Sequence, residues 1–460
     1  MKYINLKNIS PLDGRYKNLT KDLRNIFSEY GFIKYRLIVE IYWLKYLSKI
    51  PEIKELCLFN KKINNFLNMI IENFSIKDAY EIKKIEKLTN HDLNSIICFL
   101  KNKLSSIKNA NNIIEFIHFG CTSEDINNIA YALMLKKSKK QHILKYWKKI
   151  IDYMDYMSIK YKKSVILSRT HGQSATPSTM GKEIANFSYR LKRQFKQFKK
   201  IKILGKFNGA VGNYNALLIA YPNLNWEKIN RNFVNSLNIF WNPYTTQIEP
   251  HDYLSEFFSC IFRFNTILID FNRDIWGYIS LNYFKQKINF NETGSSTMPH
   301  KVNPIYFENS EGNLGISNAL IQHISCKLPI SRWQRDLSDS TVLRNLGSII
   351  SYSIISYHFI LLGLKRIKIN KKYIHYDLSK NYSILLEPLQ IIMRKMGIQN
   401  SYENIKNLFR GEKVNEKIIK KFINNLNISD SEKKKLCSLT PFNYIGKSSV
   451  LAKKIIFYKY

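Results

Sequence analysis

Residues 252–279 have the sequence DYLSEFFSCIFRFNTILIDFNRDIWGYI, and this sequence predicts one long helix. Apolar side chains recur at steps of three and four residues, as on one face of an α-helix. They are Leu254, Phe257, Phe258, Ile261, Phe264, Leu268, Phe271, Ile275 and Tyr278. Pro250 precedes the pattern and Gly277 lies near its end, which is typical of helix boundaries. At 1.5 Å per residue the helix would be ~42 Å long.

Four further stretches repeat this pattern, at roughly residues 124–162, 179–203, 305–325 and 345–366. Strict alternation of apolar and polar residues is scarce, so we expect any strands to be short. Five long amphipathic helices predict an all-α protein built around a helical bundle.

The domain organisation follows from length and from these patterns. A chain of 460 residues is too long for one compact core. It contains no internal repeat and no low-complexity linker. We place the domain boundaries near residues 118 and 366, on either side of the long helical patterns. The prediction is a helical N-terminal domain at 1–117, a central bundle domain at 118–366 and a helical C-terminal domain at 367–460.

One segment is long enough to cross a bilayer, because twenty uncharged residues lie between Arg344 and Lys365. Polar residues interrupt it, so a buried bundle helix is the better interpretation. The first seven residues hold no apolar core of a secretory signal. The six cysteines show neither a zinc motif nor a disulfide framework. Together these features predict a cytoplasmic protein with no membrane association.

The formal net charge of +37 at pH 7 raises the alternative of a nucleic-acid-binding protein. However, the lysines are spread along the chain and accompany abundant Ile, Asn, Tyr and Phe. All five residue types have A/T-rich codons, so mutational bias explains them together. We therefore expect only weak, incidental RNA binding, and no specific nucleic-acid partner.

A polar run interrupts the helical patterns at residues 294–304, which have the sequence GSSTMPHKVNP. Gly294 and the hydroxyls suit a loop whose backbone N–H groups face an anion, and Lys301 adds a cation. Asn303 and Pro304 predict the N-cap and the first residue of a helix. The run is compatible with a lid over a small polyanion and also with an ordinary surface loop.

This run resembles the signature loop of the fumarase/aspartase superfamily of lyases, and its sequence is most similar to that of the bacterial adenylosuccinate lyase family. Matching segments follow in family order along nearly the whole chain. They are SPLDGRY at 10–16, TNHD at 89–92, HFGCTSED at 118–125, SRTHGQ at 168–173, NPYTTQ at 242–247 and RWQRD at 332–336. Ser174 departs from the family, which usually has proline or another residue there, and could change the rigidity of that loop.

The resemblance implies a central five-helix bundle that contributes to a twenty-helix core in a homotetramer with shared active sites. It also implies β-elimination of fumarate from two succinylated purine nucleotides. Adenylosuccinate would give AMP. The succinylated aminoimidazole carboxamide ribotide, SAICAR, would give its free carboxamide, AICAR.

The resemblance assigns Ser295 as the general base and His171 as the general acid. Histidine is the natural proton donor near neutral pH. A serine hydroxyl is a weak base, so loop amides and Lys301 would have to stabilise its alkoxide. Outside the matching motifs, a lone serine beside glycine is usually a turn residue, and a lone loop histidine is usually structural or exposed.

The remaining matches imply substrate contacts, with arginines and hydroxyls suited to a phosphate dianion. They are Arg15, Tyr16, Asn90, His91, Asp92, Thr122, Ser123, Thr170, Gln247, Ser296, Lys301, Asn303, Asn309, Arg335, Ser340, Thr341 and Arg344. Thr122 also fits a simpler role, because Asp125 completes a capping-box pattern with it.

No metal and no cofactor is expected. No His or Cys lies at zinc-ligand spacing near His91, and no phosphate-binding glycine motif occurs. Two rival functions remain. A sister lyase, such as argininosuccinate lyase or fumarase, would have no phosphate to bind. A basic RNA-binding protein that has lost catalysis would not need Ser295, His171 and Lys301.

Overall fold

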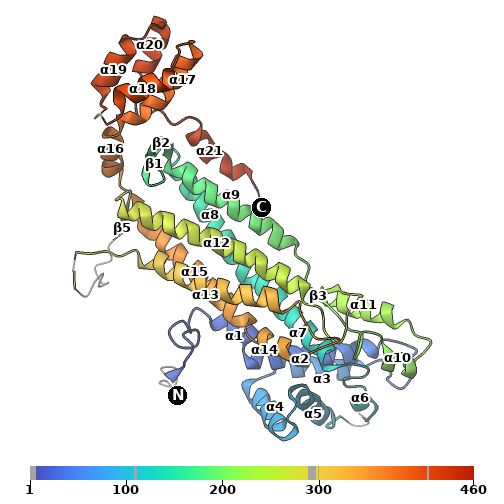
Figure 1. Cartoon of the computed structure of the whole chain (residues 1–460). Coiled ribbons are helices and arrows are strands. Elements are labelled where there is room, and N and C mark those ends of the chain that lie inside the picture. Colours follow the sequence, from blue (N-terminus) through green and yellow to red (C-terminus); the bar gives the residue numbers. More distant parts are fainter. Residues whose placement is uncertain (1–6, 108–110, 288–296, 299, 412–413, 460) are drawn as a thin grey trace. The chain divides into compact units, whose positions relative to one another are not determined.

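The computed structural model describes residues 7–107, 111–287, 297–298, 300–411 and 414–459 (Figure 1). Within these ranges the chain is mostly helical. The α-helices are α1 (Lys21–Phe27), α2 (Glu29–Leu47), α3 (Lys61–Glu72), α4 (Ile76–Thr89), α5 (Asp92–Leu104), α6 (Asn111–Glu115), α7 (Ser123–Ser138), α8 (Leu144–Lys160), α9 (Met180–Lys200), α10 (Asn215–Ala220), α11 (Trp226–Ser236), α12 (Asp252–Ser280), α13 (Ile305–Lys327), α14 (Ser338–Leu343), α15 (Leu346–Arg366), α16 (Lys371–Ser379), α17 (Leu386–Lys395), α18 (Ser401–Phe409), α19 (Glu416–Asn424), α20 (Asp430–Cys437) and α21 (Ser448–Lys454).

The strands are short and pair two by two. An antiparallel pair joins β1 (Val165–Thr170) to β2 (Gln173–Thr179), and another joins β5 (Phe284–Gln286) to β6 (Ile367–Ile369). A parallel pair joins β3 (Leu204–Gly205) to β4 (Phe240–Trp241). One π-helix, η2 (Lys139–Ile143), and two 3₁₀ turns, η3 (Tyr382–Leu385) and η4 (Ile455–Phe457), complete the list. The expectations of an all-α protein and of short strands are confirmed.

The five long helices lie where the apolar patterns predict them, at α7 to α8, α9, α12, α13 and α15. One detail differs from the prediction. The pattern at 124–162 is not a single α-helix, because the π-helical turn η2 separates α7 from α8. At this turn the Nζ of Lys139 donates to the carbonyls of Lys199 (3.3 Å) and Ile201 (2.8 Å), which closes the C-terminal end of α9.

The chain divides into two compact units. Unit 1 comprises residues 1–146, 197–266 and 312–356, and unit 2 comprises residues 147–196, 267–311 and 357–460. This division does not test the boundaries predicted near residues 118 and 366, which stay a prediction, as does the tetramer.

A buried polar network ties three long helices together in unit 1. The Nδ2 of Asn265 on α12 donates to Asn318 on α13 and to Ser353 on α15, both at 3.1 Å. The hydroxyls of Ser317 and Ser353 lie 2.8 Å apart. All four side chains are buried, and each buried polar group in this network has a partner. Such a network fixes the register of the helices more sharply than apolar packing alone.

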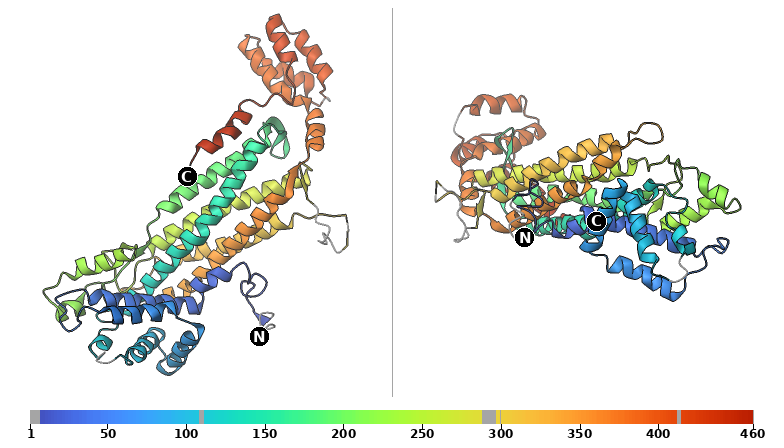
Figure 2. Two further views of the ribbon diagram at one scale, coloured as in Figure 1. Left: turned by 180° about the vertical axis from the view of Figure 1, so that it is seen from behind. Right: turned by 90° about the horizontal axis from the view of Figure 1, so that it is seen from below.

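Unit 2 contains the other ends of the five long helices, packed side by side. Contacts between neighbouring helices are Ser188–Asp155 (α9–α8), Phe187–Phe271 (α9–α12), Asn272–Ser310 (α12–α13) and Tyr306–Phe359 (α13–α15). Helices α17 to α20 form a small cluster of their own (Figure 1). Beyond it, α21 returns along α9 (Figure 2), where the Nζ of Lys192 donates to the carbonyl of Ile455 at 2.8 Å.

One segment of the described chain, Ser338–Arg366, is long and apolar enough to cross a membrane, with a mean hydropathy of 1.5. However, 61% of its most apolar window is buried within the protein. Its serines also make internal contacts, as Ser353 does in the network above. This burial is typical of a bundle helix in a soluble core.

Candidate active site

A cavity of about 700 Å³ in unit 1 is lined almost entirely by polar and charged side chains. Its lining residues are Lys83, Glu86, Lys87, Asn90, His91, Asp92, Ser123, Asn127, Arg335, Leu337, Ser340, Thr341 and Arg344. We call this cavity the unit 1 pocket. Eight predicted substrate contacts line it: Asn90, His91, Asp92, Ser123, Arg335, Ser340, Thr341 and Arg344. The fold therefore gathers residues that the sequence places far apart, in a volume suited to a small ligand.

The turn between α4 and α5 supplies one side of the unit 1 pocket. Asn90 ends α4 in the left-handed conformation at φ 50°, which asparagine tolerates better than most residues. His91 then caps α5, because its Nδ1 accepts the backbone N–H of Asn94 at 3.1 Å. With Nδ1 engaged as an acceptor, the neutral imidazole carries its proton on Nε2. This exposed ring can therefore donate a hydrogen bond to a ligand.

Asp92 is held by a buried arginine. The Nη2 of Arg36 lies 2.8 Å from Oδ2 of Asp92, and the Nε of Arg36 donates to Asn127 at 2.7 Å. Arg36 is 2% exposed, and its guanidinium stacks 3.7 Å above the ring of Phe32. Burial alone would raise the pKa of Asp92, but the Arg36 charge and hydrogen bond outweigh burial, so the pKa lies below its usual value.

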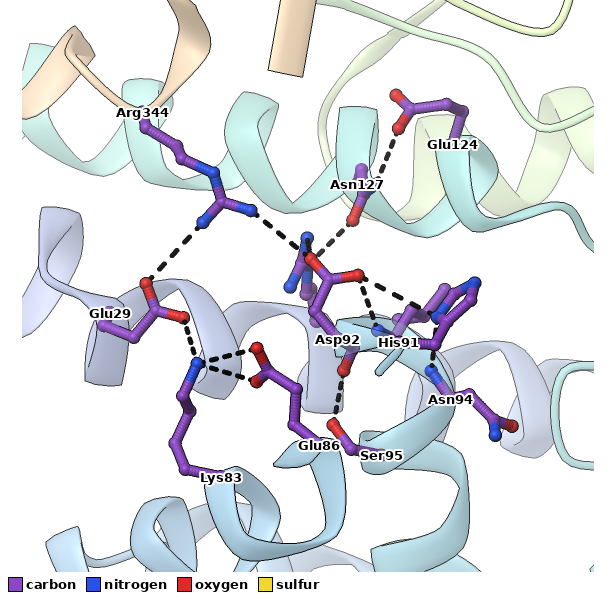
Figure 3. Close-up of polar contacts among 12 residues, drawn as sticks. Glu29, Lys83, Glu86, His91, Asp92, Asn94, Ser95, Glu124, Asn127 and Arg344 are labelled. Atoms are coloured by element: carbon purple, nitrogen blue, oxygen red, sulfur yellow. Dashed lines mark hydrogen bonds and ion pairs between the residues drawn. The ribbon is translucent and has the colours of Figure 1, made fainter. Parts of the chain in front are cut away.

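Arg344 reaches the same carboxylate from the solvent side (Figure 3). Its guanidinium lies 3.5 Å from Asp92 and 3.7 Å from Glu29, and its side chain is 44% exposed. Lys83 in turn bonds Glu29 at 3.4 Å and Glu86 at 2.8 Å. Exposed ion pairs at these distances are weak. A phosphate dianion, which an arginine can bind in bidentate fashion, would compete well for Arg344.

Arg335 is oriented more firmly than Arg344. Its Nη1 donates to Gln247 and its Nη2 to Glu124, both at 3.0 Å. Glu124 is 4% exposed in its side chain and also accepts the amide of Asn127 at 2.6 Å. The buried Nε of Arg335 has no hydrogen-bond partner among the described residues. Gln247, another predicted contact, thus belongs to the same group of side chains even though it does not line the cavity.

The start of α7 brings Thr122 and Ser123 to this group. Thr122 donates its backbone N–H to Oδ2 of Asp125 at 2.8 Å, as the capping-box pattern predicted. Asp125 also pairs with Lys206 at 2.9 Å, and both side chains are fully buried. Its Oδ1 accepts the backbone N–H of Asn208 at 2.9 Å. Asp125 therefore anchors the beginning of α7 in the interior of unit 1, while Ser123 lines the pocket.

Arg15 and Tyr16 lie on a series of turns before α1, also in unit 1. The guanidinium of the exposed Arg15 lies 6.0 Å from the centre of the Tyr16 ring. The turns are pinned by Thr20, whose hydroxyl donates to the carbonyl of Leu12 at 2.9 Å. A second cavity, of about 290 Å³, lies between Leu12 and Arg344. Arg344 therefore borders the cavity beside these turns as well as the unit 1 pocket.

Thr170 and His171 lie in unit 2, on a β-hairpin. Strand β1 ends at Thr170 and β2 begins at Gln173, so His171 and Gly172 form a two-residue turn. Both have positive φ, 53° for His171 and 76° for Gly172, as a type I′ turn requires. This hairpin was not predicted, because we placed the segment on a loop between helices. A short polar pair ending in glycine was the signal for it.

An ion pair and a buried tyrosine brace the His171 hairpin. Arg169 pairs with Asp377 of α16 at 2.7 Å, and the hydroxyl of Tyr283 donates to the same carboxylate at 2.5 Å. Burial, then the hydrogen bond to Asp377, raise the pKa of Tyr283, so the phenol stays protonated. The exposed imidazole of His171 is thus presented on a rigid turn rather than on a loose loop.

The polar run at 294–304 is described only in part. Ser295 and Ser296 lie outside the described residues. Lys301 is exposed, and its backbone N–H donates to the carbonyl of Met298 at 3.0 Å. Helix α13 begins at Ile305, so Asn303 lies just before it, one residue earlier than an N-cap, and Asn309 lies in its first turns. Lys301, Asn303 and Asn309 all belong to unit 2.

Several side chains of this site were missed from the sequence. Lys83 and Lys87 add cations to the unit 1 pocket, and Asn127 also lines it. Arg36 and Glu124 orient the lining side chains of Asp92 and Arg335. Arg36 carried a signal, because it interrupts the apolar run of α2 on a face that is otherwise buried. In the described part of the chain no group of three His, Cys, Asp or Glu residues could hold a metal ion.

Comparison with known proteins identifies the family of the chain. Residues 14–320 match a family model described as "Lyase", and residues 331–445 match one described as "Adenylosuccinate lyase C-terminal". The adenylosuccinate lyase of Buchnera aphidicola subsp. Acyrthosiphon pisum is 59% identical over 99% of this chain and 100% of its own. That of Escherichia coli strain K12 is 52% identical over the same shares of both chains.

Solved structures share the fold. A fumarate lyase from Mesorhizobium sp. BNC1 superposes with a TM-score of 0.75 at 13% identity, covering 95% of this chain and 97% of its own. The 3-carboxy-cis,cis-muconate lactonizing enzyme from Pseudomonas putida gives 0.74 at 17% identity, covering 95% and 96%. With its sequence matched along nearly its whole length, the chain is a lyase that belongs to the adenylosuccinate lyase family of the fumarase/aspartase superfamily.

Proposed function

We propose that the protein eliminates fumarate from adenylosuccinate, giving AMP, and from SAICAR, giving AICAR, in purine nucleotide biosynthesis. Membership of the adenylosuccinate lyase family is the observation that carries this proposal. The unit 1 pocket supports it, because its lining supplies cations and hydrogen-bond donors for an anionic substrate. A sister lyase without a phosphate to bind would not need this set.

The chemistry requires two proton transfers. The hydroxyl oxygen of Ser295, activated as an alkoxide, would take the proton from the carbon next to one succinyl carboxylate. The electron pair left behind forms the double bond of fumarate as the adjacent carbon–nitrogen bond breaks. The imidazolium of His171 would protonate the departing nitrogen. Lys301, with Ser296 and Asn303, would stabilise the negative charge that develops on the carboxylate.

The substrate phosphate would bind near α14. Arg344 is the best candidate, because its pairs with Asp92 and Glu29 are exposed and long. Ser340 and Thr341 lie beside it in the lining and can donate hydroxyl hydrogen bonds. Arg335 and Arg15 would add charge. Asn90, His91 and Ser123, which line the same cavity, would face the succinyl group or the base.

The active form would be a homotetramer in the cytoplasm, with each active site shared between subunits. One feature supports assembly: the long helices expose apolar side chains such as Trp276 and Ile316, which a second subunit could cover. Mixing a Ser295→Ala variant with a His171→Asn variant tests the proposal. Hybrid tetramers should regain part of the activity that both parents lack, and no recovery would argue against shared sites.

Ultraviolet spectroscopy of the purified protein with adenylosuccinate tests the reaction directly. Loss of the succinylated purine spectrum, with AMP and fumarate in equal amounts, is the expected result. Argininosuccinate and malate serve as controls, and turnover of either would favour a sister lyase. Tight RNA binding at physiological salt without turnover would favour the RNA-binding alternative, whereas binding that falls steeply with salt is what net charge alone predicts.

A further inference from the structure

A buried histidine bridges two carboxylates beside α14. His251 immediately precedes α12, and its side chain is 3% exposed. Its Nδ1 lies 3.7 Å from Oε2 of Glu249, and its Nε2 lies 3.5 Å from Oδ2 of Asp339. The two acids are 1% and 5% exposed. None of these three residues was predicted as a site residue from the sequence.

The Glu249 end of this bridge is fixed by its own contacts. Oε1 of Glu249 accepts the amide of Asn242 at 2.9 Å, and Oε2 accepts the backbone N–H of His251 at 2.7 Å. The backbone of His251 has φ 69°, a left-handed conformation that is uncommon for residues other than glycine. Such strain persists only where surrounding contacts over-determine it, and it concentrates near functional sites.

The Asp339 end leads directly to the unit 1 pocket. Oδ1 of Asp339 accepts the backbone N–H of Ser340 at 2.7 Å. Ser340 and Thr341 follow on α14, and Arg344 caps the end of this short helix. Leu337, at the N-cap, gives α14 no side-chain cap. The Asp339 carboxylate therefore contacts the helix that carries the residues of the proposed phosphate site.

Charge balance makes the histidine essential to this arrangement. Two buried carboxylates beside each other would repel, and leaving either unpaired would be costly. Burial alone would lower the pKa of His251, but Asp339 and Glu249 outweigh it and raise the pKa to about 9. The ring is thus an imidazolium at neutral pH. Nε2 of His251 and Oδ2 of Asp339 have no hydrogen-bond partner among the described residues, so these two groups interact as an ion pair at 3.5 Å.

We propose that His251 is a positioning residue for substrate binding, which ties Asp339 and the start of α14 to Glu249 so that Ser340, Thr341 and Arg344 are preorganised for a phosphate. Through these contacts His251 acts on the substrate without touching it. This inference rests on the proposed function for its choice of ligand. It assigns a role within the site to three residues that have no direct access to the pocket.

Steady-state kinetics of His251→Gln and Asp339→Asn, with adenylosuccinate and with the dephosphorylated succinyl nucleoside, test the proposal. Each variant should raise the KM for adenylosuccinate by about 10-fold or more, because a charge-assisted contact to α14 is lost. The value of kcat should change by less than about threefold, and the KM for the dephosphorylated substrate should stay the same. The double variant should be no worse than the poorer single variant, since both remove one bridge.

His118→Gln is the matched control. His118 pairs with Glu40 of α2 at 2.7 Å, and this hydrogen bond raises its pKa above the usual value although burial alone would lower it. It offers a second partly buried His–carboxylate pair in unit 1. Its replacement should lower the melting temperature while leaving KM unchanged. A KM for His251→Gln within twofold of wild type, or an equal change with and without the phosphate, would overturn the proposal.

The pH dependence of stability tests the bridge independently of turnover. The charged groups facing His251 are Glu249 and Asp339. The pKa is 6.5 in the unfolded chain and about 9 in the folded one, so the bridge stabilises fully below pH 6.5 and is lost as pH rises through 9. The wild-type protein should therefore be more stable to unfolding than His251→Gln at pH 6.5, and this difference in stability should disappear as the pH rises to 9. A constant difference would refute the bridge.

If wild type shows the shift but no turnover, the proposed function alone fails. If His251→Gln does not fold, Asp339→Asn supplies both measurements.

Discussion

The unit 1 pocket and the His171 hairpin of unit 2 present polar groups in opposite ways. In the pocket, two binding side chains are held by buried partners: Arg36 holds Asp92, and Glu124 holds Arg335. In the hairpin, the contacts of Arg169 and Tyr283 with Asp377 hold the strands, and His171 itself is exposed at the turn. A side chain that binds substrate benefits from a fixed orientation. A proton donor must reach the substrate, so its side chain stays accessible while the backbone of the turn holds its position.

Loss of the proton-transfer groups should have the largest effect. Asparagine tolerates the positive φ of position 171, so His171→Asn should keep the hairpin and lose only the acid. Both His171→Asn and Ser295→Ala should lower kcat by ~10²–10⁴-fold while KM changes little. Single-turnover measurements with adenylosuccinate check this. A variant that keeps near wild-type kcat would show that the corresponding residue does not transfer the proton.

Removal of the buried brace should have the next largest effect, and on stability rather than on kcat. Arg36→Met leaves Asp92 and Asn127 without the partner that they share. Breaking a fully buried pair in this way typically costs ~3–5 kcal/mol, and because Asp92 is 34% exposed we expect a loss at the lower end of this range, which urea unfolding would measure. Substitution of an exposed cation in the same region, Lys83→Met, is the control and should cost less than ~1 kcal/mol. Equal losses for the two variants would contradict the distinction between buried and exposed ion pairs.

Arg344→Ala should weaken substrate binding more than it weakens the fold. Loss of a charge-assisted contact to phosphate, ~1.5–3 kcal/mol, predicts a rise in KM of ~10-fold or more for both succinylated nucleotides. The dephosphorylated succinyl nucleoside should lose little further in this variant, because the contact is already absent. Additive losses, the same with and without phosphate, would mean that Arg344 supports the fold and does not touch the phosphate.

The smallest expected effect concerns glycine-to-alanine substitutions, which should act in opposite directions in the hairpin turn and in a helix of the same unit. An added methyl group meets nothing within 4 Å at either Gly172 or Gly277, so only backbone conformation distinguishes the two sites. Gly172 has φ 76°, and alanine there should cost ~1–2 kcal/mol. Gly277 lies in α12, where alanine should stabilise by ~0.4–1 kcal/mol. Thermal melting of both variants checks the signs, and stabilisation by Gly172→Ala would refute the type I′ turn.

The sequence by itself determined the helices and the chemistry of the site. Apolar side chains at three- and four-residue steps can be buried only as one face of a helix, so the bounds of α9, α12, α13 and α15 followed from local pattern. The residue types in the matching motifs likewise indicated an anionic substrate before any geometry was known. For Asp125, one partner was local, because a capping box joins residues only three positions apart.

Only the tertiary structure decided which of these residues meet and what braces them. The pairs Arg36–Asp92, Glu124–Arg335 and His251–Asp339 join positions far apart in the chain, and no local pattern encodes such contacts. The hairpin at His171 was missed for a related reason. Its strands are stabilised by pairing with each other and by Asp377, so their propensity appears only when the partners are present. The local periodicity of apolar residues reflects which helix face is buried. Pairing between distant side chains depends on the fold that this burial produces.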